Sequence, residues 1–397
     1  MHRRTFTQGI VAVSVASLAG SGCAEEEGVL VGPDDGDAPK RLGIDGGVLV
    51  DPEGAPIRLR GVNVEGVDAG EAADIRDGLG LNVVRMRISF EGDHRDDAHP
   101  TALSARYRDE IDGWVRACRA AGVWMILEMR GDDALTNSPE LYDTTSKDFD
   151  AYKRAWVHLA AAYKRTSFIA GYGLLAEPSV NKATKDDRVH TLTDFHLALM
   201  AAITDDAGDE RTLFFVGPDW NYDTMQYRHD AYHDAYVARA GRLVYEVNLL
   251  MPKPWIQDGT DPAGEPIAFP GAPEPFAFDE FLAPVDGVSP DDWETTFSKH
   301  REDPALFPKL LTRSFLPWYL QWPLAFRAKF AIPMIVDQFG ASADAGGQLD
   351  YERAVLDLLE SERLHWCRWS YNAGSADRML KKDGAAYALY AALPKSG

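Results

Sequence analysis

Charged, amide and tryptophan side chains recur in this sequence at the points where short apolar runs end. In chain order they are Asn63, Arg85, Arg87, Glu128, Arg130, Glu177, Asp219, Trp220, Glu246, Asn248, Asp337, Gln338 and Trp369. Tryptophan rings stack on the apolar faces of sugar rings, while charged and amide groups bind sugar hydroxyls. Two carboxyl groups at the right separation can also cleave a glycosidic bond. The residue types therefore suit a polyhydroxylated ligand.

The apolar runs that precede these residues alternate with amphipathic segments. The runs are 57–64, 82–89, 123–130, 169–177, 212–218, 242–251, 333–339 and 365–371. Between the third and fourth runs, Tyr152, Trp156 and Leu159 share one helical face. Eight apolar strands separated by helices predict a parallel sheet, and their number favours a closed (β/α)8 TIM barrel over an open doubly wound sheet. The dinucleotide-binding alternative is weakened because no GxGxxG motif follows the first run.

Two further segments modify the predicted barrel. Residues 46–61 contain two apolar runs around Pro52-Glu53-Gly54, which predicts a short N-terminal hairpin. Residues 253–310, between the sixth and seventh strands, hold ten of the 23 prolines and eight aromatic residues. This aromatic content predicts a long insertion that packs as a wall of the cleft at the carboxyl end of the barrel. Barrel enzymes carry their working groups at that end, so we expect the strand-end residues to meet there.

An ordered set of segments resembles glycoside hydrolase family 5, the cellulase family. The segments are 46–63, LGLNVVRMRIS, AAGVWMILEM, GYGLLAEP, VYEVNLLMP, MIVDQFG and CRWSYN, and together they span nearly all of residues 46–374. The resemblance implies a (β/α)8 barrel that hydrolyses β-glycosidic bonds with retention of configuration. It also implies an acid/base glutamate in an Asn-Glu-Pro motif on strand four and a nucleophilic glutamate before Phe-Gly on strand seven.

Three positions keep the residue that the family uses. Arg85 matches the strand-two arginine, Glu177 matches the acid/base, and Trp369 matches the strand-eight tryptophan beside the scissile bond. The resemblance therefore implies that Glu177 holds the acid/base position and that Trp369 is a sugar platform. Trp220 is a further candidate platform. Core packing is the alternative role for both tryptophans.

Five other positions depart from the family pattern. Arg130 and Ala176 replace a histidine and an asparagine, Asn248 and Leu250 replace a histidine and a tyrosine, and Gln338 occupies the position of the nucleophile. A glutamine amide is a poor nucleophile and carries no charge to stabilise an oxocarbenium ion. Because retention needs two carboxyl groups about 5–5.5 Å apart, we expect the ordinary retaining hydrolysis to be impaired.

Residues next to Gln338 and Glu177 affect whether either position can take part in hydrolysis. Successive strand residues point to opposite faces, so Asp337 should face away from the pocket if Gln338 faces in. An ion pair between Glu177 and either Arg130 or Arg85 would favour the carboxylate form of a group that must donate a proton. Arg130 has a second possible role, which is to contact an anionic substituent of a ligand.

Two functional hypotheses follow. The first is a barrel that engages a β-linked glycan or glycoconjugate with its retaining chemistry impaired. The alternative is an active O-glycosyl hydrolase that uses Glu177 as the acid with a non-standard second carboxylate. An inverting base about 6.5–9.5 Å from the acid would have Glu128, Asp219 or Glu246 as candidates. In either case the expected ligand-binding residues are Arg85, Arg130, Asn248, Trp369 and Trp220.

The first 42 residues are typical of an export signal and a tether. Residues 1–22 combine a basic start with a short apolar run, which predicts a signal peptide, and Arg3-Arg4-Thr5-Phe6 resembles a twin-arginine signal. Cys23 follows Gly-Ser-Gly, which fits either a lipoprotein cleavage site or an ordinary cleavage region. Residues 23–42 read as an acidic linker and 43–397 as the barrel. We therefore expect an exported protein that is periplasmic, extracellular or lipid-anchored at the bacterial cell envelope.

The composition excludes several classes of protein. There are 41 Lys+Arg against 62 Asp+Glu, a formal charge of -21, which argues against a nucleic-acid binder. A lipid on Cys23 would be the only link to a membrane. The three cysteines and ten histidines show no metal-ligand spacing, so the sequence predicts neither a metal nor a cofactor. We expect a monomer whose partner is a carbohydrate ligand.

Overall fold

The computed structural model describes most of the chain between residues 32 and 395. The described residues are 32–36, 38–91, 103–131, 133–180, 182, 184–210, 212–217, 229–275, 301–372, 380 and 384–395. Residues 1–22, Cys23, Asp219 and Trp220 lie outside them, and so do residues 276–300 of the predicted insertion. The signal peptide, the lipid on Cys23 and the Trp220 platform therefore stay predictions.

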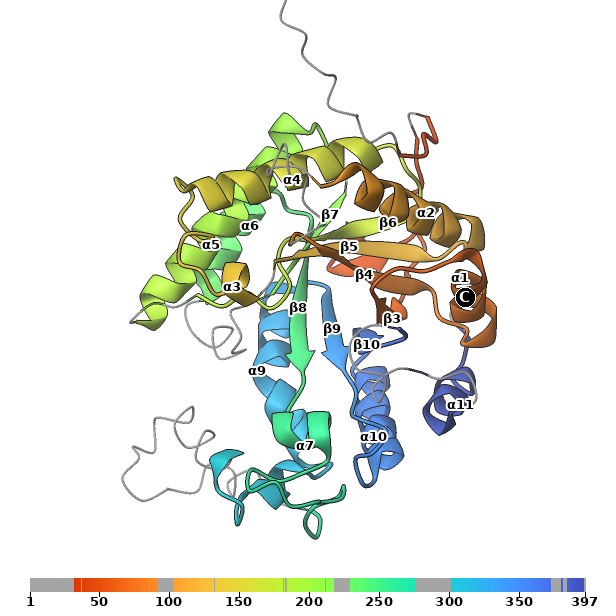
Figure 1. The fold of residues 1–397 in the computed structure, drawn as a ribbon, viewed down its shortest axis with the longest axis vertical. Helices are drawn as coiled ribbons and strands as arrows, with labels where there is room; N and C mark the ends of the chain where they lie inside the picture. Colours follow the sequence, from red (N-terminus) through yellow and green to blue (C-terminus); the bar gives the residue numbers. More distant parts are fainter. Residues whose placement is uncertain are drawn as a thin grey trace, which may run out of the picture.

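Eight parallel strands close into a barrel, which confirms the predicted (β/α)8 architecture (Figure 1). The strands are β3 (Arg60–Val64), β4 (Val83–Ser89), β5 (Trp124–Arg130), β6 (Ile169–Gly173), β7 (Leu213–Val216), β8 (Leu243–Leu249), β9 (Met334–Phe339) and β10 (His365–Arg368). Each strand pairs with the next along the chain, and β10 also pairs with β3, which closes the ring. All eight strands lie within the runs that the apolar pattern predicts.

Helices cover the outside of the barrel. They are α1 (Ala69–Ala73), α2 (Ala105–Ala121), α3 (Asp133–Thr136), α4 (Lys147–Tyr163), α5 (Lys185–Ala201), α6 (His229–Arg239), α7 (Lys253–Asp258), α9 (Phe315–Phe330), α10 (Gln348–Ser361) and α11 (Ala385–Ala391). Two π-helical turns, Asp74–Gly78 and Ala202–Asp206, and a 3₁₀ turn, Phe307–Leu310, complete the set. None of the helices in the described part of the chain is long and apolar enough to cross a membrane.

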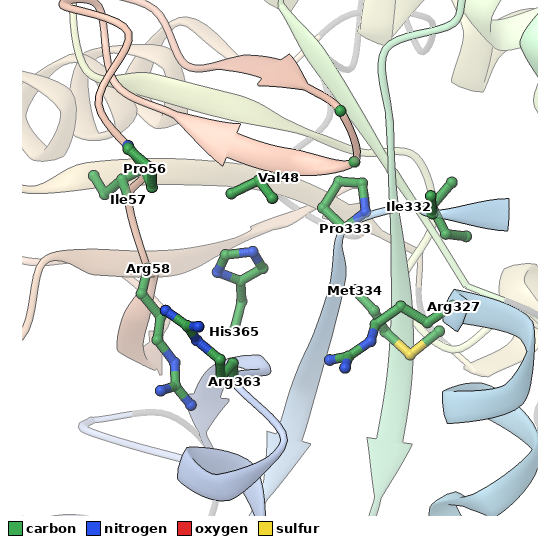
Figure 2. A pocket seen from close by; sticks show the side chains of 13 residues that line it. Val48, Pro56, Ile57, Arg58, Arg327, Ile332, Pro333, Met334, Arg363 and His365 are labelled. Carbon is green, nitrogen blue, oxygen red and sulfur yellow. The ribbon is translucent and has the colours of Figure 1, made fainter. Parts of the chain in front are cut away.

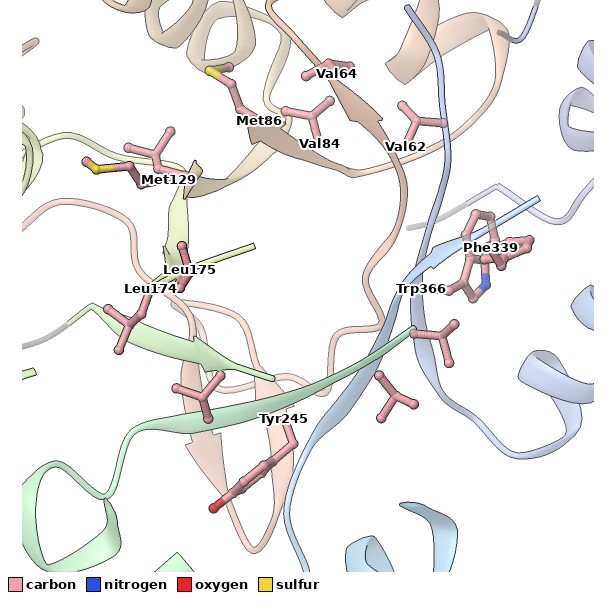
Figure 3. Close-up of a cluster of buried hydrophobic side chains, with 14 of the residues drawn as sticks. Val62, Val64, Val84, Met86, Met129, Leu174, Leu175, Tyr245, Phe339 and Trp366 are labelled. Carbon is pink, nitrogen blue, oxygen red and sulfur yellow. The ribbon is translucent and has the colours of Figure 1, made fainter. Parts of the chain in front are cut away.

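Local signals set the limits of these helices. α2 begins after Ser104, whose hydroxyl accepts a hydrogen bond from the Tyr107 amide, and it ends at Gly122 in a left-handed conformation. Such caps satisfy the amide and carbonyl groups that a helix end leaves open. The outward-facing strand residues meet the buried helix faces in one continuous apolar layer, as Val62, Val84 and Met86 do (Figure 3).

The predicted N-terminal hairpin is present and closes the amino end of the barrel. It consists of β1 (Gly43–Asp45) and β2 (Val48–Val50), which pair antiparallel. Its Leu49 and the preceding Leu42 join the apolar cluster that fills the barrel interior. The interior is therefore apolar at the amino end, and polar groups can occupy only its carboxyl end.

The insertion between β8 and β9 lies beside the carboxyl ends of these strands (Figure 1). Trp255 of α7 is fully buried, its indole N–H donates to the Ile267 carbonyl at 2.9 Å, and its ring packs against Tyr351 of α10. The Ser342 amide after β9 donates to the Ile256 carbonyl at 2.9 Å. Trp255 is thus a packing residue that fixes the insertion to the loop after β9.

Candidate active site

A buried arginine organises the polar end of the barrel interior. Arg85 of β4 is 1% exposed, and its Nη1 donates to Asn63 Oδ1 at 3.0 Å. Its Nε lies 3.2 Å from Glu246 Oε1, its Nη2 lies 2.8 Å from Asp337 Oδ2, and the same Nη2 donates to Glu128. One guanidinium therefore holds the side chains of four other strands together.

The strand period explains why these residues converge. Each follows, two positions later, an interior residue of its own strand, and side chains two apart on a strand share a face. The interior residues are Gly61 before Asn63, Val83 before Arg85, Ile126 before Glu128, Val244 before Glu246 and Ile335 before Asp337. The barrel interior thus changes from apolar to charged within one layer of side chains.

Charge in this layer is not balanced by the single guanidinium. Burial raises the pKa of Glu128 well above its usual range and raises the pKa of Glu246, and Arg85 opposes both shifts. Burial likewise raises the pKa of Asp337 to about 7, against the attraction of Arg85. The pKa of Arg85 itself is raised because the three carboxylates outweigh the effect of burial. The layer therefore retains a proton near neutral pH.

The same three carboxylates have oxygens within 4.8 Å of one another, a spacing that could hold a metal ion. Arg85 donates to all three of them, however, and supplies the positive charge at their centre. The spacing of Glu128, Glu246 and Asp337 is therefore explained by the guanidinium that they share.

Asp337 shares the interior face of β9 with Ile335, so the expectation that it faces away from the pocket is wrong, and the ladder bulges at this residue. Val247 of β8 pairs with Val336, but Asn248 pairs with Gln338, so Asp337 is an extra residue in the ladder. A bulge of this kind interrupts the alternation of side chains along a strand. Asp337 binds Arg85 in the interior, and Gln338 shares the side of its partner Asn248.

Asn248 connects the two strands at this bulge. With its amide oriented to satisfy hydrogen bonding, Asn248 donates to Asp337 Oδ1 at 2.8 Å and to Oδ2 at 3.0 Å. Both carboxylate oxygens of Asp337 therefore have donors, from Asn248 and from Arg85. Asn248 therefore holds Asp337 in place.

Glu177 and Arg130 form an ion pair at the mouth of the barrel. Arg130 Nη1 lies 2.9 Å from Glu177 Oε2, and the Glu177 side chain is 8% exposed. Glu177 has a φ of 50°, a left-handed conformation that is uncommon outside glycine, four residues after β6 ends. The Glu177 carboxylate also contributes to raising the pKa of Glu128 and Asp337. It therefore lies close enough to the buried layer to act on it electrostatically.

Gln338 and Trp369 have polar groups that bind no other group among the described residues. Gln338 is 4% exposed, and no described residue forms a hydrogen bond with its side chain. The indole N–H of Trp369 is buried and likewise finds no acceptor among the residues that the structure describes. The Trp369 amide donates to the Phe339 carbonyl at 2.7 Å, which fixes this residue beside the end of β9. A buried N–H without a partner is costly unless a ligand or water satisfies it.

A family model described as cellulase, glycosyl hydrolase family 5, matches residues 50–247, which include Arg85, Glu128, Arg130 and Glu177. The chain belongs to glycoside hydrolase family 5. Arg85 lies on β4, the second barrel strand, and Glu177 follows β6, the fourth. Gln338 and Trp369 lie beyond the matched residues.

Solved structures share the fold at low sequence identity. Cellulose synthase subunit Z of Clostridioides difficile has 14% identity and a TM-score of 0.60, over 85% of this chain and 100% of that chain. A hyperthermophilic endo-beta-1,4-glucanase in complex with substrate has 13% identity and a TM-score of 0.60, over 84% and 96%. An endogalactoceramidase has 15% identity and a TM-score of 0.58, over 90% and 79%. No curated protein matches the sequence.

Proposed function

We propose that this family 5 barrel binds a β-linked glycan or glycoconjugate at the carboxyl end of its strands, with its retaining hydrolysis impaired. The family supports a carbohydrate ligand. The printed names of the structural neighbours, a glucanase and a galactoceramidase, support β-linked glycans and glycolipids as the classes to test. We further propose that the protein is exported, on the basis of the basic and apolar pattern of residues 1–22.

The proposal rests on a difference among the polar groups at the carboxyl end of the barrel: some are bound by other side chains and some are not. Asp337 has its oxygens bound by Arg85 and Asn248, and Glu177 is paired with Arg130. The Gln338 amide and the Trp369 indole N–H, by contrast, have no hydrogen-bond partner within the part of the chain that the structure describes. Groups of this kind bind sugar hydroxyls and stack on sugar rings without breaking a bond.

The impairment follows from the chemistry of Gln338. Retention needs a carboxylate that attacks the anomeric carbon while a second carboxyl group protonates the leaving oxygen. An amide at the attacking position supplies neither charge nor comparable nucleophilicity. By comparison with other catalytic units that lose one member, turnover should fall by several orders of magnitude.

A second candidate function is supported by the interior position of Asp337 on β9. Because Asp337 enters the barrel interior beside Gln338, it is a carboxylate in the part of the site where the family places its nucleophile. An active glycosidase would then use Glu177 as the acid and Asp337 as the non-standard second carboxylate. Asp337 would first have to leave its contacts with Arg85 and Asn248, which is why we place this candidate second.

Hydrolysis and binding measured on the same variants separate the two functions. The substrates are aryl β-glycosides, β-glucans and mannans, and binding is followed by tryptophan fluorescence. The variants are the wild type, Gln338→Glu, Glu177→Ala and Asp337→Asn, with Glu53→Gln, an exposed residue in the turn after β2, as a control. If the protein binds a glycan without cleaving it, we expect sugar to change the tryptophan fluorescence and the wild type to show no turnover. We also expect Gln338→Glu to gain turnover.

Each contrary result has a definite meaning. Wild-type hydrolysis that Glu177→Ala and Asp337→Asn both abolish, but Glu53→Gln does not, would replace the binding proposal by the second candidate. If no sugar changes the fluorescence and no substrate is cleaved, a carbohydrate function at this site is wrong.

A further inference from the structure

A second cavity lies at the amino end of the barrel, remote from the carboxyl-end site. It has a volume of about 470 Å³ and lies under the β1–β2 turn (Figure 2). Its thirteen lining residues include Gly47, Val48, Arg58, Arg327, Arg363 and His365. These residues precede β3, β9 and β10, so the cavity opens at the ends of the strands where the apolar interior begins.

One wall of this cavity forms where the backbone of the β1–β2 turn packs closely against the end of α9. Gly47 has a φ of 82°, and a Cβ at this position would lie 1.9 Å from the Ala331 carbonyl oxygen. Ala331 is the residue that ends α9, also in a left-handed conformation. The hairpin turn is therefore seated against the end of α9, and glycine allows it.

Positive charge gathers around the cavity although the chain as a whole is strongly acidic. Arg58 and Arg60 share the carboxylate of Glu360, and Arg327 lies near that of Glu362. Arg363 has no acidic partner among the described residues, so these four guanidiniums exceed the two carboxylates by two charges. None of the thirteen lining residues is acidic. Burial and the neighbouring guanidiniums lower the pKa of Arg58 despite its pairing with Glu360. Additional negative charge would therefore be favourable here.

The arginines differ in how many hydrogen bonds and ion pairs their guanidiniums already form within the protein. Arg58 donates to the carbonyls of Leu364 and Leu359 and to Glu360, so it is a structural member of the wall. Arg327 Nη1 donates to the Glu362 carbonyl at 2.7 Å, and its Nη2 lies 3.9 Å from the carboxylate of that residue. Arg363 is exposed, and its guanidinium forms no hydrogen bond or ion pair with the described residues. Arg327 and Arg363 are thus the two guanidiniums with capacity for a ligand.

A buried histidine adds a donor without a partner. His365 is 7% exposed, and its Nδ1 accepts a hydrogen bond from the Leu59 amide at 3.0 Å, which places the ring proton on Nε2. No described residue accepts from Nε2, and Figure 2 shows the ring among the lining residues. Burial, with Arg58 and Arg327, lowers the pKa of His365 to about 3, so the ring stays neutral.

The remaining lining is apolar and partly open. Val48 is 47% exposed, and Ile57, Ile332 and Pro333 add apolar surface around the charged groups. A cavity of this volume is in the usual range for small-molecule sites, which combine apolar walls with a few convergent polar groups. Guanidinium groups bind carboxylate and phosphate oxygens in paired hydrogen bonds.

We propose that this cavity binds a small organic oxyanion, a carboxylate or phosphate on an apolar body. The oxyanion faces Arg327, Arg363 and His365 Nε2, and the apolar body lies along Val48 and Pro333. This site goes beyond the proposed glycan function because it is at the opposite end of the barrel.

Calorimetric titration of the whole protein with benzoate and phenyl phosphate tests the proposal, with benzyl alcohol as the uncharged probe. We expect both anions to bind, benzyl alcohol to bind much more weakly, and higher salt to weaken the anions because it screens charge. Arg363→Gln and Arg327→Gln should each weaken binding roughly tenfold, as expected for loss of a hydrogen bond to a charged group. Arg116→Gln, an exposed arginine of α2, is the matched control.

Three results would overturn the proposal: no binding of either anion, equal binding of benzyl alcohol, or Arg363→Gln binding as the Arg116→Gln control does. Because the Arg363 side chain is exposed and its guanidinium forms no hydrogen bond or ion pair with the described residues, its substitution should leave the urea midpoint of unfolding unchanged. A loss of binding in Arg363→Gln can therefore be assigned to the site itself.

Discussion

Replacing Asp337 by asparagine should remove a pH dependence of stability that the buried layer creates. In the folded chain the pKa of Asp337 is about 7, compared with an ordinary value of 3.8. Between these values the folded state holds a proton that the unfolded state has released. Stability must therefore fall as the pH rises from 4 to 8, since the folded state binds more protons. Asparagine keeps the shape of the side chain and does not titrate.

The size of the effect follows from the same two values. One pKa unit is worth about 1.4 kcal/mol, so the difference between 3.8 and about 7 is worth about 4 kcal/mol. Relative to Asp337→Asn, the wild type should lose about that much free energy of unfolding between pH 4 and pH 8. The loss reflects burial of a third carboxylate beside Glu128 and Glu246, for which one guanidinium is not enough.

Urea unfolding at half-unit pH steps measures this difference directly. The control is Asp350→Asn, which removes an exposed carboxylate on α10. Its stability should follow that of the wild type across the range. If the wild-type and Asp337→Asn curves run parallel within about 1 kcal/mol from pH 4 to pH 8, Asp337 is not held protonated and the reasoning fails.

Three further substitutions test other parts of the structure. Arg85→Met should lower the free energy of unfolding at pH 8 by about 3–5 kcal/mol, because it leaves buried carboxylates unpaired; a loss below 1 kcal/mol in urea would contradict this. Gly47→Ala should cost roughly 1–3 kcal/mol through its contact with Ala331, measured against Gly46→Ala, where a Cβ meets nothing within 4 Å. Gln338→Glu should raise hydrolysis of aryl β-glycosides by at least tenfold over the wild type, and an unchanged rate would show that the other departures also block turnover.

The barrel and much of its polar end could be predicted from the sequence because their signals are local. Apolar runs and helical faces depend on the spacing of neighbours along the chain, and they predicted all eight strands. Arg85, Glu128 and Glu246 stand at strand ends, so their convergence at one end of the barrel followed once the barrel was recognised.

The contacts among these residues could not be predicted in the same way. Arg85 meets Glu246 and Asp337 across long stretches of chain, and which carboxylates share a guanidinium depends on how the strands are tilted and registered in the closed ring. The pairing of Glu177 with Arg130 rather than Arg85 was likewise left open by the sequence.

Asp337 shows what the sequence determines and what only the tertiary structure decides. The sequence by itself determined that a glutamine stands at the nucleophile position and that an aspartate precedes it. Only the tertiary structure decided that Asp337 binds Arg85 in the barrel interior and that Gln338 pairs with Asn248, because a bulge arises from the register between β9 and β8. Residue identity is a property of one position, whereas side-chain direction at a bulge depends on the neighbouring strand.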